Sequence, residues 1–330
     1  MKPNKNTMTR LKFLIALPLL ALASAVMAQA SFPTRPVKIV LGFPAGGPLD
    51  QHVRLLTDKL QTVLGQPVLV DYKAGAGGIV GAQEVMKSPA DGYTLMLANT
   101  GVMVINPALY SKLPYNTLKD FVPIARTAMQ PLALLVNPGV PAQTLPEFVR
   151  YAQANPGKIN FASAGSGGIS HLVPEMFKSA TGLYMVHIPY RGSAPAFTDL
   201  MGGQVQFMAE SIPQAAQYHK QGKVRALAVT SRERNPALPD VPTVMETRVA
   251  KNFEVVGFYG FLAPAGTPKA VVDKLSDAFK QVLALPEVRN RMVSQGADPA
   301  FLGADEFAKF LSDEMPKWAA TVNASGARVD

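Results

Sequence analysis

The sequence predicts an α/β protein with two lobes. A short β-branched and apolar run, 37–41, is followed by a glycine-rich turn and then by apolar residues at helical spacing over 49–64. The same order recurs further along the chain, where a strand at 158–162 leads into a second glycine-rich turn, 163–168, and another helix. Two such units about one domain's length apart predict two lobes, each with a mostly parallel sheet flanked by helices.

The two glycine-rich turns are candidate anion sites. The first turn of a helix carries unpaired N–H groups and the positive end of the helix dipole, and glycine lets a ligand approach the backbone closely. One Gly-Gly turn is equally well explained as a tight strand-to-helix connection, but the second copy favours one ligand held between two lobes. Neither turn contains Lys or Arg, so backbone N–H groups are the expected donors. Asp50, at the start of the first helix, is more readily explained as a cap than as a ligand contact.

The N-terminus and the composition indicate an exported protein. Basic residues, the apolar run 13–26 and the sequence Ala28-Gln29-Ala30 predict a cleaved signal peptide, residues 1–30, and hence a periplasmic location. No later segment supplies the ~20 apolar residues of a membrane helix. Removing the four cations of the signal peptide lowers the formal net charge from +9 to +5, and the remaining cations are scattered, which argues against nucleic-acid binding. The chain has no cysteine, which excludes disulfides and thiolate chemistry.

The remaining elements alternate along the chain. Segment 106–123 reads as irregular, and the last of three C-terminal helices is expected to start near Ala304 and to kink at Pro316. These C-terminal elements lack a complete sheet of their own, so we expect them to pack on the first lobe. Lobe 1 is therefore predicted as 31–130 and 230–330 and lobe 2 as 131–229, joined by two crossing strands. Further strands are expected at 67–71, 93–97, 132–136, 185–190, 205–209, 224–229 and 255–262.

An enzyme would need a constellation that these residues do not supply. The four histidines are scattered, and no H-E-x-x-H pattern occurs, so no metal site is expected. Ser170 and His171 are neighbours in sequence and do not face each other, and no G-x-S-x-G elbow is present. The segment 75–80 lacks the third glycine of the dinucleotide pattern. We therefore expect no catalytic residue and no cofactor, with a secreted hydrolase as the alternative of another class.

Stretches distributed over nearly the whole mature chain match one protein family in order. They include FPTRPVKIVLGFPAGGPLD (32–50), QPVLVDYKAGAGGIVGA (66–82), DGYTLMLANTG (91–101), ANPGKINFASAGSGGISHL (154–172) and VHIPYRGSAPAFTDLMGGQV (186–205). On these stretches the chain resembles the Bug-type periplasmic substrate-binding proteins of tripartite tricarboxylate transporters. The resemblance implies a two-lobed, type II-like periplasmic binding protein fold that closes over a small carboxylate, either a di- or tricarboxylate or a related organic acid.

The resemblance also implies partners. A receptor of this kind delivers its ligand to the membrane subunits of a tripartite transporter and acts as a monomer. A receptor of the same fold that serves a sensor kinase is the alternative within this class. Neither needs a nucleic acid, a metal or a cofactor.

The candidate ligand-binding residues lie in turns that follow strands. Asn99 and Thr100 follow the strand at 93–97, at the sheet edge where open α/β folds bind ligands. The resemblance adds residues of four further turns: Phe43, Ala45 and Gly46; Ser163, Ala164 and Ser166; Tyr190, Gly192 and Ser193; and Glu210.

Two positions in these stretches, Glu210 and Arg191, leave alternatives open. Glu210 stands where relatives often carry Asp, and it either accepts a hydrogen bond from a ligand hydroxyl or ammonium or is a paired structural acid. Arg191 is a candidate carboxylate clamp or an exposed cation, and Tyr190 is better placed for a direct hydrogen bond. Val102-Met103 make one wall more apolar than in many relatives.

Overall fold

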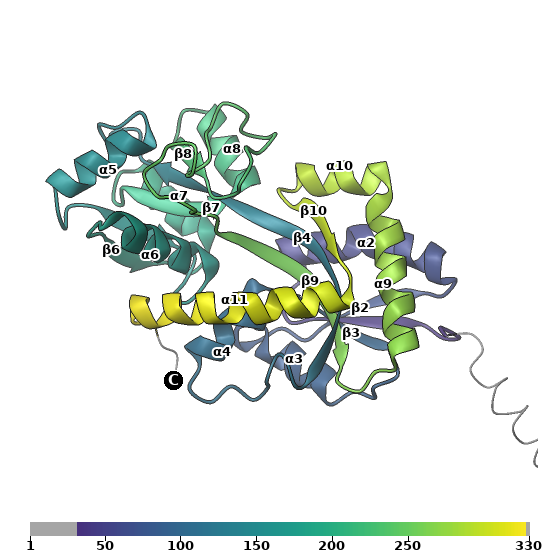
Figure 1. Cartoon of the computed structure of the whole chain (residues 1–330). Helices are drawn as coiled ribbons and strands as arrows, with labels where there is room; N and C mark the ends of the chain where they lie inside the picture. The colour runs from purple at the N-terminus through teal and green to yellow at the C-terminus, as the bar shows by residue number, and fades with distance from the viewer. Residues whose placement is uncertain (1–31, 328–330) are drawn as a thin grey trace, which may run out of the picture.

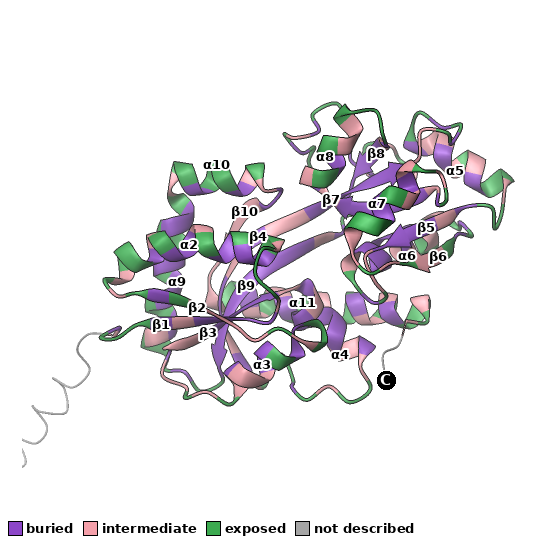
Figure 2. Cartoon of the chain, turned by 180° about the vertical axis from the view of Figure 1, so that it is seen from behind, coloured by how far each residue is buried: buried purple, intermediate pink, exposed green. Residues whose placement is uncertain are grey.

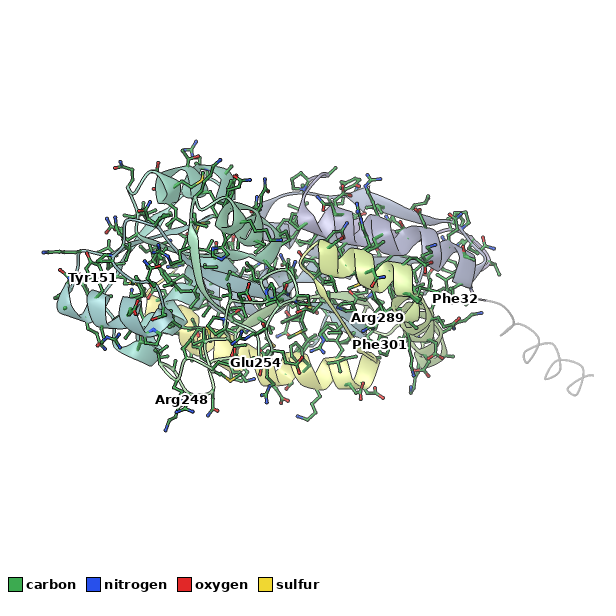
Figure 3. The ribbon with its side chains drawn as sticks, turned by 90° about the horizontal axis from the view of Figure 1, so that it is seen from above. Phe32, Tyr151, Arg248, Glu254, Arg289 and Phe301 are labelled. Atoms are coloured by element: carbon green, nitrogen blue, oxygen red, sulfur yellow. The ribbon has the colours of Figure 1, made fainter. Side chains whose placement is uncertain are left out.

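The computed structural model describes residues 32–327 and shows an elongated molecule with two lobes lying end to end (Figure 1). Phe32 lies at one end and Tyr151 at the other (Figure 3). The predicted signal peptide, residues 1–30, lies outside the described residues. No described helix has the length and apolar character that crossing a membrane requires. Each lobe contains strands flanked by helices, which confirms the predicted two-lobed α/β architecture.

The first lobe is built on three parallel strands in the order β2-β1-β3. Side chains alternate along a strand, so Ile39 packs into the core on one face of β1 and Val40 into the core on the other. Figure 2 shows β1 and β3 largely buried, the edge strand β2 partly exposed, and the outer faces of the helices exposed. The elements of this part are β1 (Val37–Leu41), α2 (Pro48–Leu64), β2 (Val68–Tyr72), η1 (Ala76–Gly78), α3 (Ile79–Met86), β3 (Thr94–Asn99), α9 (Lys269–Ala284) and α10 (Pro286–Ser294).

The two lobes share one long strand, β4 (Phe121–Val136). Its first part pairs antiparallel with β9 (Val256–Pro264), and its last part, 132–136, pairs antiparallel with lobe 2. In Figure 1, β4 and β9 run side by side from one lobe toward the other. These antiparallel crossing strands separate the parallel parts of the two sheets.

Sequence reasoning recognised only 132–136 of β4 and treated 106–123 as irregular, which holds for 110–120 but was wrong at both ends, where α4 and the start of β4 lie. Pro123 lies at a register shift of the β4–β9 pair, and Pro131 ends that pairing, so both prolines occupy positions where a strand tolerates proline. Three more elements were missed: η2 (Gly101–Ile105), α4 (Asn106–Leu109) and β10 (Asp298–Leu302).

The second lobe repeats the strand-turn-helix arrangement. Its strands β6-β5-β7 are parallel, and β4 pairs with both β7 and β8. Thr144 and Glu147 form a capping box at the start of its first helix, as the Thr-Leu-Pro-Glu sequence favours. The elements are α5 (Leu145–Ala154), β5 (Asn160–Ser163), α6 (Ile169–Thr181), β6 (Val186–Pro189), α7 (Ser193–Met201), β7 (Phe207–Ser211), α8 (Ile212–Lys220) and β8 (Arg225–Val229).

The segment after β8 packs on the second lobe before the chain returns to the first. Leu238 and Val241 are buried in the same cluster as Leu200 of α7. The Val255 N–H donates to the Thr230 carbonyl (3.1 Å), and β9 then begins at 256. We propose that lobe 2 extends from about 132 to 255, rather than ending at 229.

The last helix, α11 (Ala304–Ser325), connects the lobes along one side. It contacts β4 and α4, and its buried Trp318 belongs to the same core cluster as Phe177 of α6. The helix continues through Pro316 as one element, so the expected kink does not interrupt it (Figure 1). Pro316 is exposed, and water can satisfy the carbonyl that loses its helical partner.

Candidate functional site

A cavity of about 230 Å³ lies between the lobes, where residues at the C-terminal end of β3 meet residues at the N-terminal end of α6. The crossing strands contribute Gln130 and Gly257 to its wall. The full lining is Phe43, Gly77, Asn99, Thr100, Gly101, Asn106, Leu109, Tyr110, Gln130, Ser166, Gly167, Gly168, Ile169 and Gly257.

A larger groove, of about 620 Å³, lies on the second lobe among α5, β8 and the segment 234–247. It is lined only by residues that pack with lobe 2, so a ligand there would not bridge the lobes. A third cavity, of about 470 Å³, also touches both lobes, through Met176 on one side and Arg126 on the other, but the carboxylates of Glu254, Asp313 and Glu314 line it. The cavity of about 230 Å³ is therefore the better candidate for an anion, because both lobes contribute to it and no acidic side chain lines it.

The structure brings four of the predicted ligand residues to this cavity: Phe43, Asn99, Thr100 and Ser166. The hydroxyl oxygen of Thr100 accepts a hydrogen bond from the Phe258 N–H (2.7 Å), which attaches the end of β3 to β9. The side-chain oxygen of Asn99 accepts from the Val102 N–H (3.1 Å). Both residues thus shape the start of the segment 101–109 as well as lining the cavity.

The rest of the first glycine-rich turn lies outside the cavity lining. Ala45 and Gly46 are exposed, and the Gly46 N–H donates to Asp50 Oδ2 (2.8 Å). Asp50 also accepts from Arg54 Nε (2.9 Å) and from the Tyr72 hydroxyl. Burial opposes the charge on Asp50, but the hydrogen bonds from Tyr72, Gly46 and Arg54 hold the pKa of this carboxyl below its usual value. The acid therefore holds the turn in place, in agreement with the capping interpretation.

The second glycine-rich turn is held by side chains of α6 and β6. The Ala164 N–H donates to Ser170 Oγ (3.0 Å), and the Gly167 N–H donates to His171 Nδ1 (3.1 Å). The Ser163 hydroxyl lies 2.6 Å from His187 Nε2. Ser163 and Ala164 are thus occupied inside the turn, whereas Ser166 is exposed to the cavity.

Two stacked histidines support this turn. The rings of His171 and His187 have centroids 3.7 Å apart, and the Phe161 ring stacks on His187 at 4.9 Å. Burial and the nearby Lys178 lower the pKa of each histidine to about 4, so both rings are neutral at pH 7. Because His171 accepts at Nδ1, its proton is on Nε2, which lies 3.9 Å from the Glu175 carboxylate. Sequence reasoning considered His171 only beside Ser170, as part of a possible hydrolase, and did not give it this role.

Stability should fall with acid because of these histidines. In the unfolded chain each histidine titrates near pH 6.5, whereas in the fold the pKa is about 4. The unfolded state therefore binds more protons as the pH falls, and the stabilisation present above pH 6.5 is lost progressively down to about pH 4. The variant His171→Asn keeps an acceptor for the Gly167 N–H and does not titrate. Over this pH range its free energy of unfolding should therefore decrease by roughly 1–3 kcal/mol less than that of the wild type.

Urea denaturation of both proteins at pH 7, 5.5 and 4.5 measures this difference. A variant that loses as much stability as wild type would show that His171 is not held neutral by the fold.

The remaining predicted residues form a second cluster on lobe 2. The Tyr190 hydroxyl donates to Asp199 Oδ2 (2.6 Å), and burial together with this acid raises the pKa of Tyr190 to about 12. The Ser193 hydroxyl donates to Glu210 Oε2 (2.6 Å), and the Ser211 N–H donates to Glu210 Oε1 (2.8 Å). The Gly192 N–H donates to the Ala164 carbonyl (3.1 Å), which ties this cluster to the second glycine-rich turn. None of these four predicted residues is among the described residues that line the cavity.

Several lining residues were missed by sequence reasoning. Tyr110 and Leu109 belong to the segment read as irregular, and Gln130 lies on the unrecognised part of β4. No local signal singles out Gln130, because the strand before Pro131 also carries the polar residues Arg126 and Thr127. Among the residues from 32 to 327, no group of three or more His, Asp or Glu could hold a metal ion.

Comparison with known proteins gives consistent similarities. A family model described as the tripartite tricarboxylate transporter family receptor matches residues 52–327. Protein BugT of Bordetella pertussis (strain Tohama I) is 35% identical over 324 residues, which cover 98% of this chain and 99% of BugT.

Two solved structures are similar over most of the chain. Rpa4515 of R. palustris with adipate has a TM-score of 0.78 and 30% identity, and the match covers 91% of this chain and 100% of that one. MatC (Rpa3494) from Rhodopseudomonas palustris with bound malate has a TM-score of 0.73 and 33% identity, with 88% and 100% covered. These likenesses confirm the predicted two-lobed, type II-like periplasmic binding protein fold.

Proposed function

Because the chain belongs to the tripartite tricarboxylate transporter receptor family, we propose that it is a periplasmic receptor that binds one small carboxylate between its lobes. The observation that carries the proposal is the cavity to which both lobes contribute, at the N-terminal end of α6. Similar proteins whose structures contain adipate and malate support a carboxylate as the ligand.

The carboxylate would lie against the turn before α6. Gly168 is the N-cap of this 13-residue helix and has no side-chain cap, so the helix start keeps its attraction for an anion. Ser166, Gly167 and Ile169 line the cavity beside it. Phe43, Asn99 and Thr100 would meet the ligand from the first lobe.

The other predicted residues would act at a distance from the ligand. Ala45 and Gly46 stay with the turn that Asp50 holds, and Ser163, Ala164 and Gly192 connect the second turn to its neighbours. Tyr190, Ser193 and Glu210 would fix the α7 side of lobe 2, and the two hydrogen bonds to Glu210 favour the structural role over ligand contact.

A binding role is better supported than a hydrolase. Ser170 Oγ accepts from the Ala164 N–H and His171 Nδ1 accepts from the Gly167 N–H, so each is used to hold the turn. A nucleophile and its base would instead have to be bonded to each other. We therefore infer an exported, monomeric receptor with no catalytic role that delivers its ligand to the membrane subunits of a tripartite transporter. A sensor kinase as partner is the second possibility, and a sensor gene beside this one, in place of transporter membrane genes, would favour it.

Calorimetric titration tests the proposed function. Purified mature protein at pH 7 is titrated with a panel of carboxylates of four to six carbons, namely butyrate, succinate, malate, adipate and citrate, and with butyramide as the uncharged control. We expect saturable binding of at least one carboxylate, because the α6 N-terminus favours an anion, and no binding of butyramide. Failure of the whole panel to bind, or turnover of ester or amide substrates by the protein, would contradict the proposal.

A further inference from the structure

Asn106 is an almost fully buried amide at the start of α4. It is 5% exposed and lines the cavity between the lobes. Its Nδ2 donates to the Gly77 carbonyl (3.3 Å). Because a carbonyl oxygen can only accept, the nitrogen of the amide, and not its oxygen, must lie on that side.

Tyr115 fixes the same orientation from a second direction. Its hydroxyl donates to the Val102 carbonyl, and its oxygen accepts from Asn106 Nδ2 (3.4 Å). Tyr115 is buried, and burial raises the pKa of its hydroxyl, so the proton stays on the oxygen at pH 7. Both hydrogens of the Asn106 amide are therefore used by groups of the first lobe.

The oxygen of the Asn106 amide is left without a donor. No described residue donates to Asn106 Oδ1, and His52 is the one described residue with a side-chain polar atom that is both unpaired and sealed from solvent. Oδ1 is therefore accessible, and the space that it reaches is the cavity that Asn106 lines. A fixed acceptor of this kind calls for a ligand that can donate a hydrogen bond.

Asn99, which precedes the segment 101–105, presents the opposite chemistry. Its side-chain oxygen accepts from the Val102 N–H (3.1 Å), so its amide hydrogens have no acceptor among the described residues, and it lines the cavity as well. Those hydrogens, like the N-terminus of α6, suit a carboxylate. Asn106 Oδ1 does not, because an ionised carboxylate can only accept. The first lobe therefore offers the ligand a donor and a separate acceptor.

We propose that Asn106 determines specificity by accepting a hydrogen bond from the ligand, so that the receptor prefers a carboxylate with a hydroxyl or ammonium group to the same carboxylate without one. This rests on the proposed function, because it assumes that a carboxylate occupies the cavity, and it holds for one carboxylate or two. Before binding, solvent can donate to Oδ1. A ligand that displaces the solvent and has no donor leaves the acceptor unpaired, which is costly in a protein interior.

Matched carboxylates that differ by one group test the inference. Calorimetric titration of the mature protein at pH 7 compares butyrate with 3-hydroxybutyrate, succinate with malate and aspartate, and adipate with 3-hydroxyadipate, each chiral compound as both enantiomers. At least one compound with the added donor should bind about tenfold or more tightly than its parent. Malate against aspartate shows whether the preferred donor is a hydroxyl or an ammonium.

The outcomes of these titrations separate the two proposals. If a carboxylate binds but none of the substituted compounds gains tenfold over its parent, the inference is overturned and the proposed function stands. If no carboxylate of this set or of the earlier panel binds, the proposed function itself fails.

Asn106→Leu assigns the preference to this side chain. Leucine is similar in volume to asparagine and has no acceptor, so the ratio of the two affinities in the preferred pair should fall fivefold or more. A purely structural role would weaken both members of the pair alike, and an unchanged ratio would therefore overturn the assignment to Asn106. Asn106→Ala gives the same readout if the leucine variant does not fold.

Thr117→Val is the matched control, because Thr117 supports the same segment from outside the cavity. Its hydroxyl donates to the Met103 carbonyl (2.8 Å), it is 2% exposed, and it is not among the described residues that line the cavity. Its loss should lower stability and leave the affinity ratio within twofold of wild type. A ratio that falls as far in Thr117→Val as in Asn106→Leu would show that distortion of the segment, rather than loss of Oδ1, sets the preference.

Discussion

Gly167→Val should lower the affinity for a carboxylate about a hundredfold or more, because the new side chain would occupy space taken by Leu109. Gly167 belongs to the second lobe and Leu109 to α4 of the first. A Cβ on Gly167 would lie 2.4 Å from Leu109 Cδ2 and 3.3 Å from its Cγ, and Leu109 is 6% exposed and packed in the core. The contact therefore joins the two lobes beside the cavity.

The size of the effect follows from lobe closure. A ligand that touches both lobes binds best when they are close together, and it shifts the population toward that arrangement. A valine at 167 would hold the lobes apart at the cavity, so each ligand contact on one lobe would be weakened. Losing two hydrogen bonds to a charged group, at about 1.5–3 kcal/mol each, corresponds to a hundredfold or more in the dissociation constant.

Two variants separate the collision from backbone strain. Gly182 has a similar left-handed backbone (φ +67° against +76°), and no described atom lies within 4 Å of the place that a Cβ would take there. Gly182→Val should therefore cost about 1–2 kcal/mol of stability without changing affinity. Leu109→Ala in the Gly167→Val background should recover part of the lost affinity, because it removes the colliding methyl groups.

Small-angle scattering gives an independent measurement of closure. The radius of gyration of wild type should decrease when a saturating carboxylate is added, and that of Gly167→Val should change less. If Gly167→Val binds like wild type, the Leu109 contact is not part of the bound arrangement.

Local sequence patterns were sufficient for the parallel parts of both sheets. Strand, turn and helix follow one another within about thirty residues in β1–α2 and β5–α6, and apolar periodicity and glycine mark each boundary. The crossing strands were harder, because β4 pairs with β9, which is more than a hundred residues away in sequence. That pairing is tertiary information, and it overrides the tendency of Pro123 and Pro131 to end a strand.

The candidate site, like the fold, was predicted only where local sequence patterns determine it. Four predicted residues do line the cavity, and each lies in a turn that follows a strand: Phe43, Asn99, Thr100 and Ser166. A strand followed by a turn is recognisable in the sequence, and it locates the edge of the sheet where such folds bind ligands. The glycine-rich turns were expected to offer their N–H groups to the ligand. Instead, the Gly46 and Gly167 N–H groups each bond to a side chain four residues later. That spacing is visible in the sequence as Asp50 and His171, but only the fold shows which N–H group each side chain takes.

The wall formed by the crossing strands could not be predicted from local patterns. Gln130 and Gly257 meet in the cavity only because β4 and β9 cross between the lobes together. Their position therefore depends on how firmly the crossing strands are supported from outside the cavity, and α11 provides that support.

Phe307→Ala should lower the free energy of unfolding by about 3–5 kcal/mol, the usual cost of deleting a buried phenylalanine. Phe307 of α11 is 0% exposed and lies edge-on to Phe258 of β9, with ring centroids 6.2 Å apart. A Cβ on Gly260 would come within 2.3 Å of the Phe307 ring, so the ring rests directly on the backbone of β9. Its removal would leave a cavity against both crossing strands.

Urea denaturation at pH 7 measures this cost, with Phe310→Ala as the control. Phe310 is next to Phe258 as well (4.9 Å between centroids), but it is only partly buried, so its loss should cost less. Affinity for the ligand in the folded protein should stay within a few-fold of wild type, because Phe307 does not line the cavity. A loss of less than about 1 kcal/mol would mean that the neighbouring core side chains move in to fill the space left by the Phe307 ring.

A double-mutant cycle with Gly260→Ala tests the contact itself. Alone, Gly260→Ala should destabilise the protein by about 1–3 kcal/mol, because the added methyl group overpacks against Phe307. In the Phe307→Ala background the same methyl group enters the vacated space, so the double variant should be less destabilised than the two single costs added together. Residues in contact typically couple by about 0.5–3 kcal/mol, whereas simple additivity would indicate that Phe307 supports the crossing strands through other neighbours.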